Sequence, residues 1–94
     1  MTNQTETKSF PLGHLAITPS ALETLHPMDV PVALARHALG DWGDCDEEDR
    51  EANNRSIETG ARLLSVYHDR RGVKFWIITE ADRASTIVLL PEEY

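Results

Sequence analysis

Residues 62–90 read RLLSVYHDRRGVKFWIITEADRASTIVLL, and this stretch decides the fold. The four residues DRRG at positions 69–72 predict a tight hairpin, in which Gly72 supplies a positive φ. On either side of the hairpin, and again near the end of the stretch, β-branched and aromatic residues are frequent, which favours strands. The stretch therefore predicts a three-stranded antiparallel meander over residues 62–68, 73–79 and 85–90.

The residues before this meander predict helices. Thr18 is a good helix cap followed by proline, and Gly40 and Gly60 stand where the later helices are expected to end. Residues 9–17 read as a short strand or extended arm that contains Pro11 and Gly13, which places it at an edge of the sheet. The helices are expected over residues 20–25, 29–39 and 46–59.

This order of elements predicts an α+β fold, with two to three N-terminal helices packed on a three- to four-stranded antiparallel sheet. Ninety-four residues give one domain, expected over residues 9–94. The polar residues 1–8 are expected to be a disordered lead-in.

Composition limits the classes of function. A net charge of −7 disfavours direct binding to nucleic acid and to anionic lipid. A single cysteine excludes an internal disulfide and a thiolate zinc cluster. No apolar run reaches the roughly 20 residues that span a bilayer, and the N-terminus has no apolar signal segment. A cytoplasmic protein is expected.

The charge is concentrated in residues 41–51 (DWGDCDEEDRE), which hold seven carboxylates and one arginine and so carry −6 of the −7. One interpretation is a helix start whose first-turn carboxylates complement the helix dipole. A second is a site for magnesium or calcium, although the spacing lacks the twelve-residue loop with its central glycine and final glutamate. A third is a carboxylate surface that imitates nucleic acid and binds a basic groove on another protein.

Trp42 lies between Gly40 and Gly43, in the turn that enters this acidic stretch. Its large apolar ring is either packed into the core or exposed and able to bind a partner. Burial is the commoner outcome, because it removes a large apolar area from water.

A second pair of carboxylates, Glu80 and Asp82, directly follows an apolar strand. Such a pair can hold a metal ion or act as acid and base. The alternative is that both pair with arginines, namely Arg83, Arg62 or Arg36. If this loop converges with Asp41 and Asp44, the four carboxylates together would suit a metal-dependent hydrolase.

Other catalytic signals are absent from the sequence. His14, His26, His37 and His68 show no metal-binding spacing. His37 is expected to pair with Asp41 or Asp44. The carboxylates around Cys45 are expected to raise the pKa of its thiol, which opposes nucleophilic chemistry. No nucleophile elbow or glycine-rich phosphate loop exists. We therefore expect no enzyme activity, no cofactor and no metal.

Three segments together resemble one group of short bacterial proteins: RHALGDWGD (36–44), FWIITEADR (75–83) and LLPEEY (89–94). Proteins of this group are carried on plasmids, integrated elements and phages and are described as plasmid-related, some being labelled a type I restriction subunit. The resemblance spans roughly residues 12–94. It implies a mobile-element setting, in which small acidic proteins often inhibit host restriction or CRISPR complexes.

The leading hypothesis is a non-enzymatic acidic protein of a mobile element that binds a basic, nucleic-acid-binding surface of a host defence complex. A second hypothesis is a small regulator that contacts nucleic acid through Arg70, Arg71 and Lys74, although basic hairpin tips often serve solubility alone. The metal-dependent hydrolase is the third. No membrane partner is expected, and the oligomeric state is left open. The expected partner-binding residues are Asp41, Trp42, Asp44, Asp46, Glu47, Glu48, Asp49, Glu51, Glu80 and Asp82.

Overall fold

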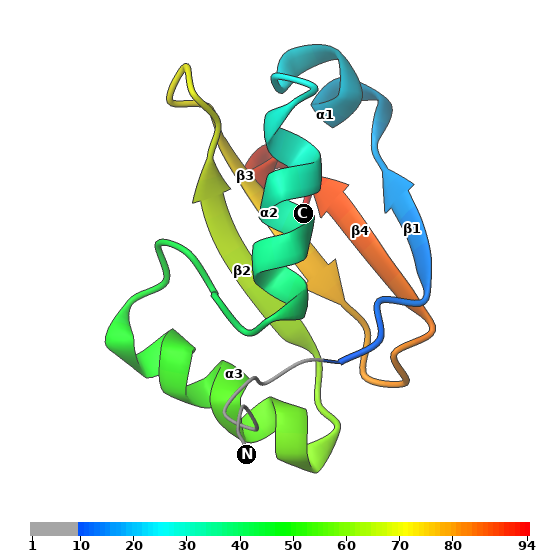
Figure 1. Cartoon of the computed structure of the whole chain (residues 1–94), viewed down its shortest axis with the longest axis vertical. Helices are drawn as coiled ribbons and strands as arrows, with labels where there is room; N and C mark the ends of the chain where they lie inside the picture. The colour runs from blue at the N-terminus through cyan, green and yellow to red at the C-terminus, as the bar shows by residue number, and fades with distance from the viewer. Residues whose placement is uncertain (1–9) are drawn as a thin grey trace, which may run out of the picture.

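The computed structural model describes residues 10–94, which form a four-stranded sheet with three helices (Figure 1). This arrangement confirms the predicted α+β class. The expected lead-in, residues 1–8, lies outside the described residues. In chain order the elements are β1 (His14–Ile17), α1 (Pro19–Thr24), α2 (Asp29–Ala38), α3 (Glu47–Thr59), β2 (Leu63–His68), β3 (Lys74–Thr79), β4 (Ser85–Leu89) and a 3-10 turn, η1 (Pro91–Glu93).

The sheet has the strand order β1-β4-β3-β2, and β2, β3 and β4 form the predicted antiparallel meander. The expectation of a wholly antiparallel sheet was wrong for β1, which runs parallel to β4 with His14 opposite Ser85. No hairpin joins these two strands. Since a long connection through all three helices and two strands separates them, tight-turn geometry does not impose an antiparallel direction.

The start of α1 and both ends of α3 follow from capping residues. The Thr18 hydroxyl accepts a hydrogen bond from the backbone N–H of Ala21, and Asp46 accepts one from Asp49. Gly60 ends α3 in the left-handed conformation, with φ of 81°. Each cap satisfies a backbone group that the helix itself leaves unpaired.

Two clusters of buried apolar side chains stabilise the domain. In the first, α1 and α2 lie over one face of the sheet, and α2 crosses in front of the strands (Figure 1). Its buried members are Ala21, Leu25, Ala33, Tyr67, Phe75, Ile77, Val88 and Leu90. The second cluster forms where α3 meets β2, and it contains Trp42, Cys45 and Leu63.

None of the helices within residues 10–94 combines the length and the apolar character that a bilayer crossing requires.

Candidate functional site

The turn that precedes the acidic stretch pairs with β2. The N–H of Val66 donates to the carbonyl of Trp42 at 3.1 Å, and the N–H of Asp44 donates to the carbonyl of Val66 at 2.7 Å. Gly43 has φ of 73°, and a Cβ atom there would lie 2.0 Å from the Val66 oxygen. Only glycine fits this position, because the two backbones approach so closely. The turn thereby covers part of the free edge of β2.

Trp42 is a core residue, with 1% of its surface exposed. Its indole N–H donates to the side-chain oxygen of Asn54 at 2.9 Å, and the Phe10 ring stacks on it at a centroid distance of 6.0 Å. The prediction that Trp42 anchors a partner was therefore wrong, and the alternative of burial is confirmed. The indole is buried rather than exposed because the glycine-flanked turn allows it to fold inward beneath α3.

Asn53 holds α3 against the edge of β2. Its amide donates to the carbonyl of Leu64 at 2.8 Å, and its side-chain oxygen accepts from the N–H of Leu64 at 3.2 Å. The side chain thus replaces a neighbouring strand at that residue. The sequence pattern did not reveal this role, since a polar residue in a mainly polar helix resembles a solvated one.

Two of the predicted partner-binding carboxylates have side-chain partners within the domain. Arg36 binds Asp41 at 2.7 Å, and this hydrogen bond lowers the pKa of Asp41. His68 binds Asp44 at 2.7 Å. The expectation that His37 pairs with either aspartate was wrong, because its two ring nitrogens contact the hydroxyls of Ser65 and Thr79 instead.

The other five carboxylates of the stretch form what we call the acidic face, which consists of Asp46, Glu47, Glu48, Asp49 and Glu51. All five are exposed, and within residues 10–94 none of them takes part in a salt bridge. The arginine between them turns inward: Arg50 donates to the carbonyl oxygens of Gly43 at 3.3 Å and Cys45 at 2.8 Å. The acidic face therefore keeps its negative charge.

Glu80 and Asp82 do not belong to the acidic face. The neighbouring Arg83 donates to the carbonyls of Ser56 at 2.9 Å and Ala61 at 2.7 Å, which lie at the C-terminal end of α3. The acidic face lies at the N-terminal end, and the 13 residues of α3 extend roughly 20 Å. The prediction that all ten residues form one binding surface is therefore corrected for these two.

The same separation weakens the hydrolase hypothesis, since Asp41 and Asp44 precede the start of α3 while the Glu80–Asp82 loop lies by its end. Nowhere in residues 10–94 do three or more histidine, cysteine, aspartate or glutamate side chains gather as a metal site would need. The expected pairing of Glu80 and Asp82 with arginines is not seen either: Arg83 binds carbonyl oxygens, and Asp82 accepts from the N–H of Ala84 at 2.9 Å.

His37 joins a buried polar network that links α2 to the sheet. Its Nδ1 lies 2.5 Å from the hydroxyl of Ser65, and its Nε2 lies 2.9 Å from the hydroxyl of Thr79. Burial, assisted by the positive charge of Arg83, lowers the pKa of His37 to about 4. The imidazole is therefore neutral at neutral pH, and 0% of its surface is exposed.

Cys45 is likewise buried, and its thiol donates to the carbonyl of Trp42 at 3.4 Å. Burial is the first cause that raises its pKa, and the negative charge of Asp49 adds to it. The predicted direction is found, although desolvation contributes more than the acidic neighbours.

The basic hairpin has internal partners. Arg70 forms a bidentate pair with Asp29 at 2.9 to 3.3 Å, and Arg71 donates to the carbonyl of Thr24 at 2.5 Å. Both arginines thus fasten the hairpin to the start of α2 and the end of α1. Lys74 is exposed. Two of the three cations of the nucleic-acid hypothesis are therefore engaged in holding the fold.

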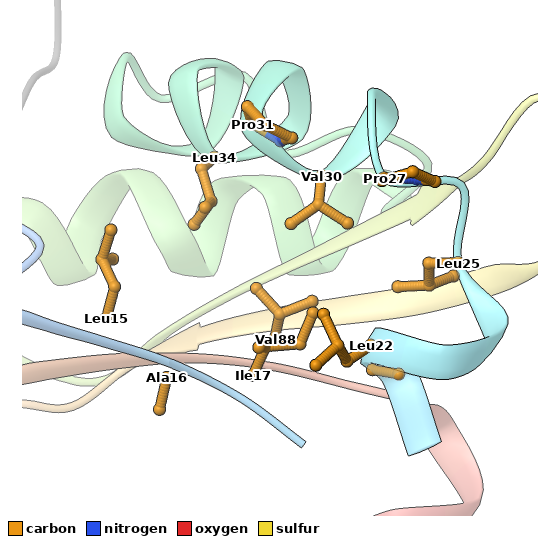
Figure 2. A pocket seen from close by; sticks show the side chains of 11 residues that line it. Leu15, Ala16, Ile17, Leu22, Leu25, Pro27, Val30, Pro31, Leu34 and Val88 are labelled. Atoms are coloured by element: carbon orange, nitrogen blue, oxygen red, sulfur yellow. The ribbon is translucent and has the colours of Figure 1, made fainter. Parts of the chain in front are cut away.

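An apolar groove lies between α1, α2 and the β1 edge of the sheet (Figure 2). It encloses about 270 Å³. Leu15 and Leu22 line it with 58% and 65% of their surfaces exposed. The groove was not predicted from the sequence; the available signal was the frequency of large apolar side chains along residues 12–34. The lining residues are Leu15, Ala16, Ile17, Ala21, Leu22, Leu25, Pro27, Val30, Pro31, Leu34 and Val88.

No family model, curated protein or solved structure matches this chain. The resemblance to plasmid-related proteins stays a prediction.

Proposed function

We propose that this chain is a non-enzymatic interaction protein of a mobile element or phage. Its acidic face binds a basic, nucleic-acid-binding surface on a host defence complex of the restriction or CRISPR type and inhibits that complex in the cytoplasm. The observation that carries the proposal is that five exposed carboxylates are left without a salt bridge in the described residues, while Arg50 turns away from them.

The density of charge supports imitation of nucleic acid. Five carboxylates lie within six residues, which span roughly 9 Å of helix, or about one carboxylate per 1.8 Å and, with Arg50 counted, one net negative charge per roughly 2.3 Å. Duplex DNA carries about one charge per 1.7 Å of axis. A basic groove built for phosphates therefore meets a similar line of negative charge, although over a shorter length.

The fold holds this face in place. Asp46 caps α3, Asn53 fixes the helix to β2, and Trp42 packs beneath it. A rigid carboxylate array loses less conformational freedom on binding than one on a mobile segment, so more of its electrostatic attraction is retained. Glu80 and Asp82 have no part in this contact.

The test is capture of host proteins on the immobilised chain at low and high salt, followed by a competition assay. We expect a captured protein that is released as salt rises, because the Debye length falls from about 10 Å at 0.1 M to about 3 Å at 1 M. We also expect the chain to displace a nucleic acid from that protein. A captured partner that resists salt and keeps its nucleic acid would contradict the proposal.

A further inference from the structure

The outer edge of β1 is open. Within residues 10–94, β1 pairs with β4 alone, at the end of the strand order β1-β4-β3-β2. The N–H groups of His14 and Thr18 donate toward β4. Because backbone groups alternate in direction along a strand, the N–H and C=O of Leu15 and Ile17 point to the open side.

Apart from the short length of β1, which has four residues, this edge lacks the features that usually keep a strand from pairing with another chain. Natural edge strands are often protected by lysine, proline or a bulge. The four residues of β1 are HLAI, with no proline or lysine among them. Between residues 10 and 28 the only Asp, Glu, Lys or Arg is Glu23.

We propose that β1 pairs with β1 of a second copy of this chain, antiparallel about a two-fold axis through Ala16. In this register the outward groups of Leu15 in one copy meet those of Ile17 in the other, and both pairs exchange two hydrogen bonds. Ala16 faces its own counterpart on the axis, and its small side chain permits the close approach. The two four-stranded sheets become one sheet of eight strands.

The apolar groove adds burial to this pairing. Leu15 and Ile17 both line it and both lie on β1 (Figure 2). In the dimer, Leu15 of each copy lies across from Ile17 of the other, so the two grooves meet at the axis. The exposed 58% of Leu15 is then covered by apolar side chains, which favours association.

Charge does not oppose a second copy at this edge. The acidic face lies by α3, which contacts β2 at the opposite edge of the sheet. In a β1–β1 dimer, seven spacings of about 4.8 Å separate the two outer strands, roughly 34 Å in all. Since the Debye length is about 8 Å at physiological salt, the repulsion between the acidic faces is screened. Both faces stay free for a partner.

Sedimentation equilibrium over about a hundredfold range of concentration tests the proposal through mass action. We expect a reversible dimer whose dissociation constant rises at least about tenfold in Leu15→Asp, because the change places a charge in the interface. Leu39→Asp is the matched control, since Leu39 is 57% exposed at the end of α2 and is expected to leave the dimer unchanged.

A cross-link provides an independent measurement. Ala16→Cys places two thiols opposite each other in a non-hydrogen-bonded pair, where Cα atoms lie about 4.5 Å apart, within the range for a disulfide. We expect it to oxidise to a covalent dimer faster than Leu39→Cys. The native Cys45 is buried and does not compete. If Leu15→Asp fails to fold, this comparison decides alone.

Two results together overturn the proposal: the wild type stays monomeric over the whole concentration range, and Ala16→Cys cross-links no faster than Leu39→Cys. The edge would then be left to a strand of another protein. A dimer that folded Leu15→Asp leaves intact overturns it as well, because the contact would then lie elsewhere.

Discussion

The guanidinium of Arg50 donates a hydrogen bond of 2.8 Å to the carbonyl oxygen of Cys45, in the turn that leads into its own helix. It also reaches the carbonyl of Gly43. The one cation within the acidic stretch is thereby engaged in positioning the turn. Because Arg50 turns inward, it forms no salt bridge with the carboxylates of the acidic face in the described residues.

Replacing Arg50 with Gln separates its structural role from binding. Loss of the two charge-assisted hydrogen bonds is expected to lower the free energy of unfolding by about 2 kcal/mol. Urea denaturation measures this change. Affinity for a basic partner should stay the same or rise, since the face becomes more negative. A folded Arg50→Gln chain that binds more weakly would show that Arg50 itself contacts the partner.

Trp42→Phe tests the buried position of the indole. The variant removes the hydrogen bond to Asn54 and leaves a small cavity, with an expected cost of about 2 kcal/mol in unfolding free energy. Partner binding by the folded fraction should be unchanged. Full stability combined with lost binding is the pattern expected of an exposed anchor, and it would contradict the structure.

His37 makes stability depend on pH. Its pKa is about 4 in the folded chain and about 6.5 when unfolded, so the unfolded chain binds more protons between these values. Its contribution is fully present above pH 6.5 and is lost as the pH falls toward 4, by up to about 3 kcal/mol. Denaturation at a series of pH values should show this slope in the wild type and a smaller one in His37→Gln. Equal slopes in both chains would exclude His37 as the cause.

Arg83 has φ of 60°, which is the left-handed region that side chains rarely adopt. Both Arg83→Gly and Arg83→Ala lose the bonds from the guanidinium to Ser56 and Ala61. Only the glycine variant relieves the backbone strain, so it is expected to be more stable than the alanine variant by about 1 kcal/mol. Thermal unfolding compares the two, and an alanine variant of equal or higher stability would argue against strain at this position.

Local chemistry made much of the fold predictable from sequence. The cap at Thr18 and the glycine at Gly60 determined where one helix begins and another ends, because each acts on backbone groups within a few residues. The hairpin at residues 69–72 fixed the register of its two strands in the same way.

Long-range pairing was not predictable. Nothing near His14 in the sequence specifies that it lies beside Ser85, so the parallel direction of β1 was missed. The partners of His37 and Asn53 come from β2 and β3, 11 to 42 residues away. The charge of the acidic stretch was predictable from its composition. Its distance from Glu80 and Asp82 was not, because that distance follows from the length of α3 and the way the helix packs.

The most direct measurement of the proposed function is capture of host proteins by the wild type and by a triple variant, Glu47→Lys, Glu48→Lys and Asp49→Lys. A matched control carries the same charge change at exposed sites outside the acidic face, Glu23→Lys, Glu58→Lys and Glu92→Lys. Circular dichroism verifies that all three chains are folded. We predict a partner that the wild type and the control retain and the triple variant loses. A partner that the triple variant holds as tightly as the wild type would contradict binding through the acidic face.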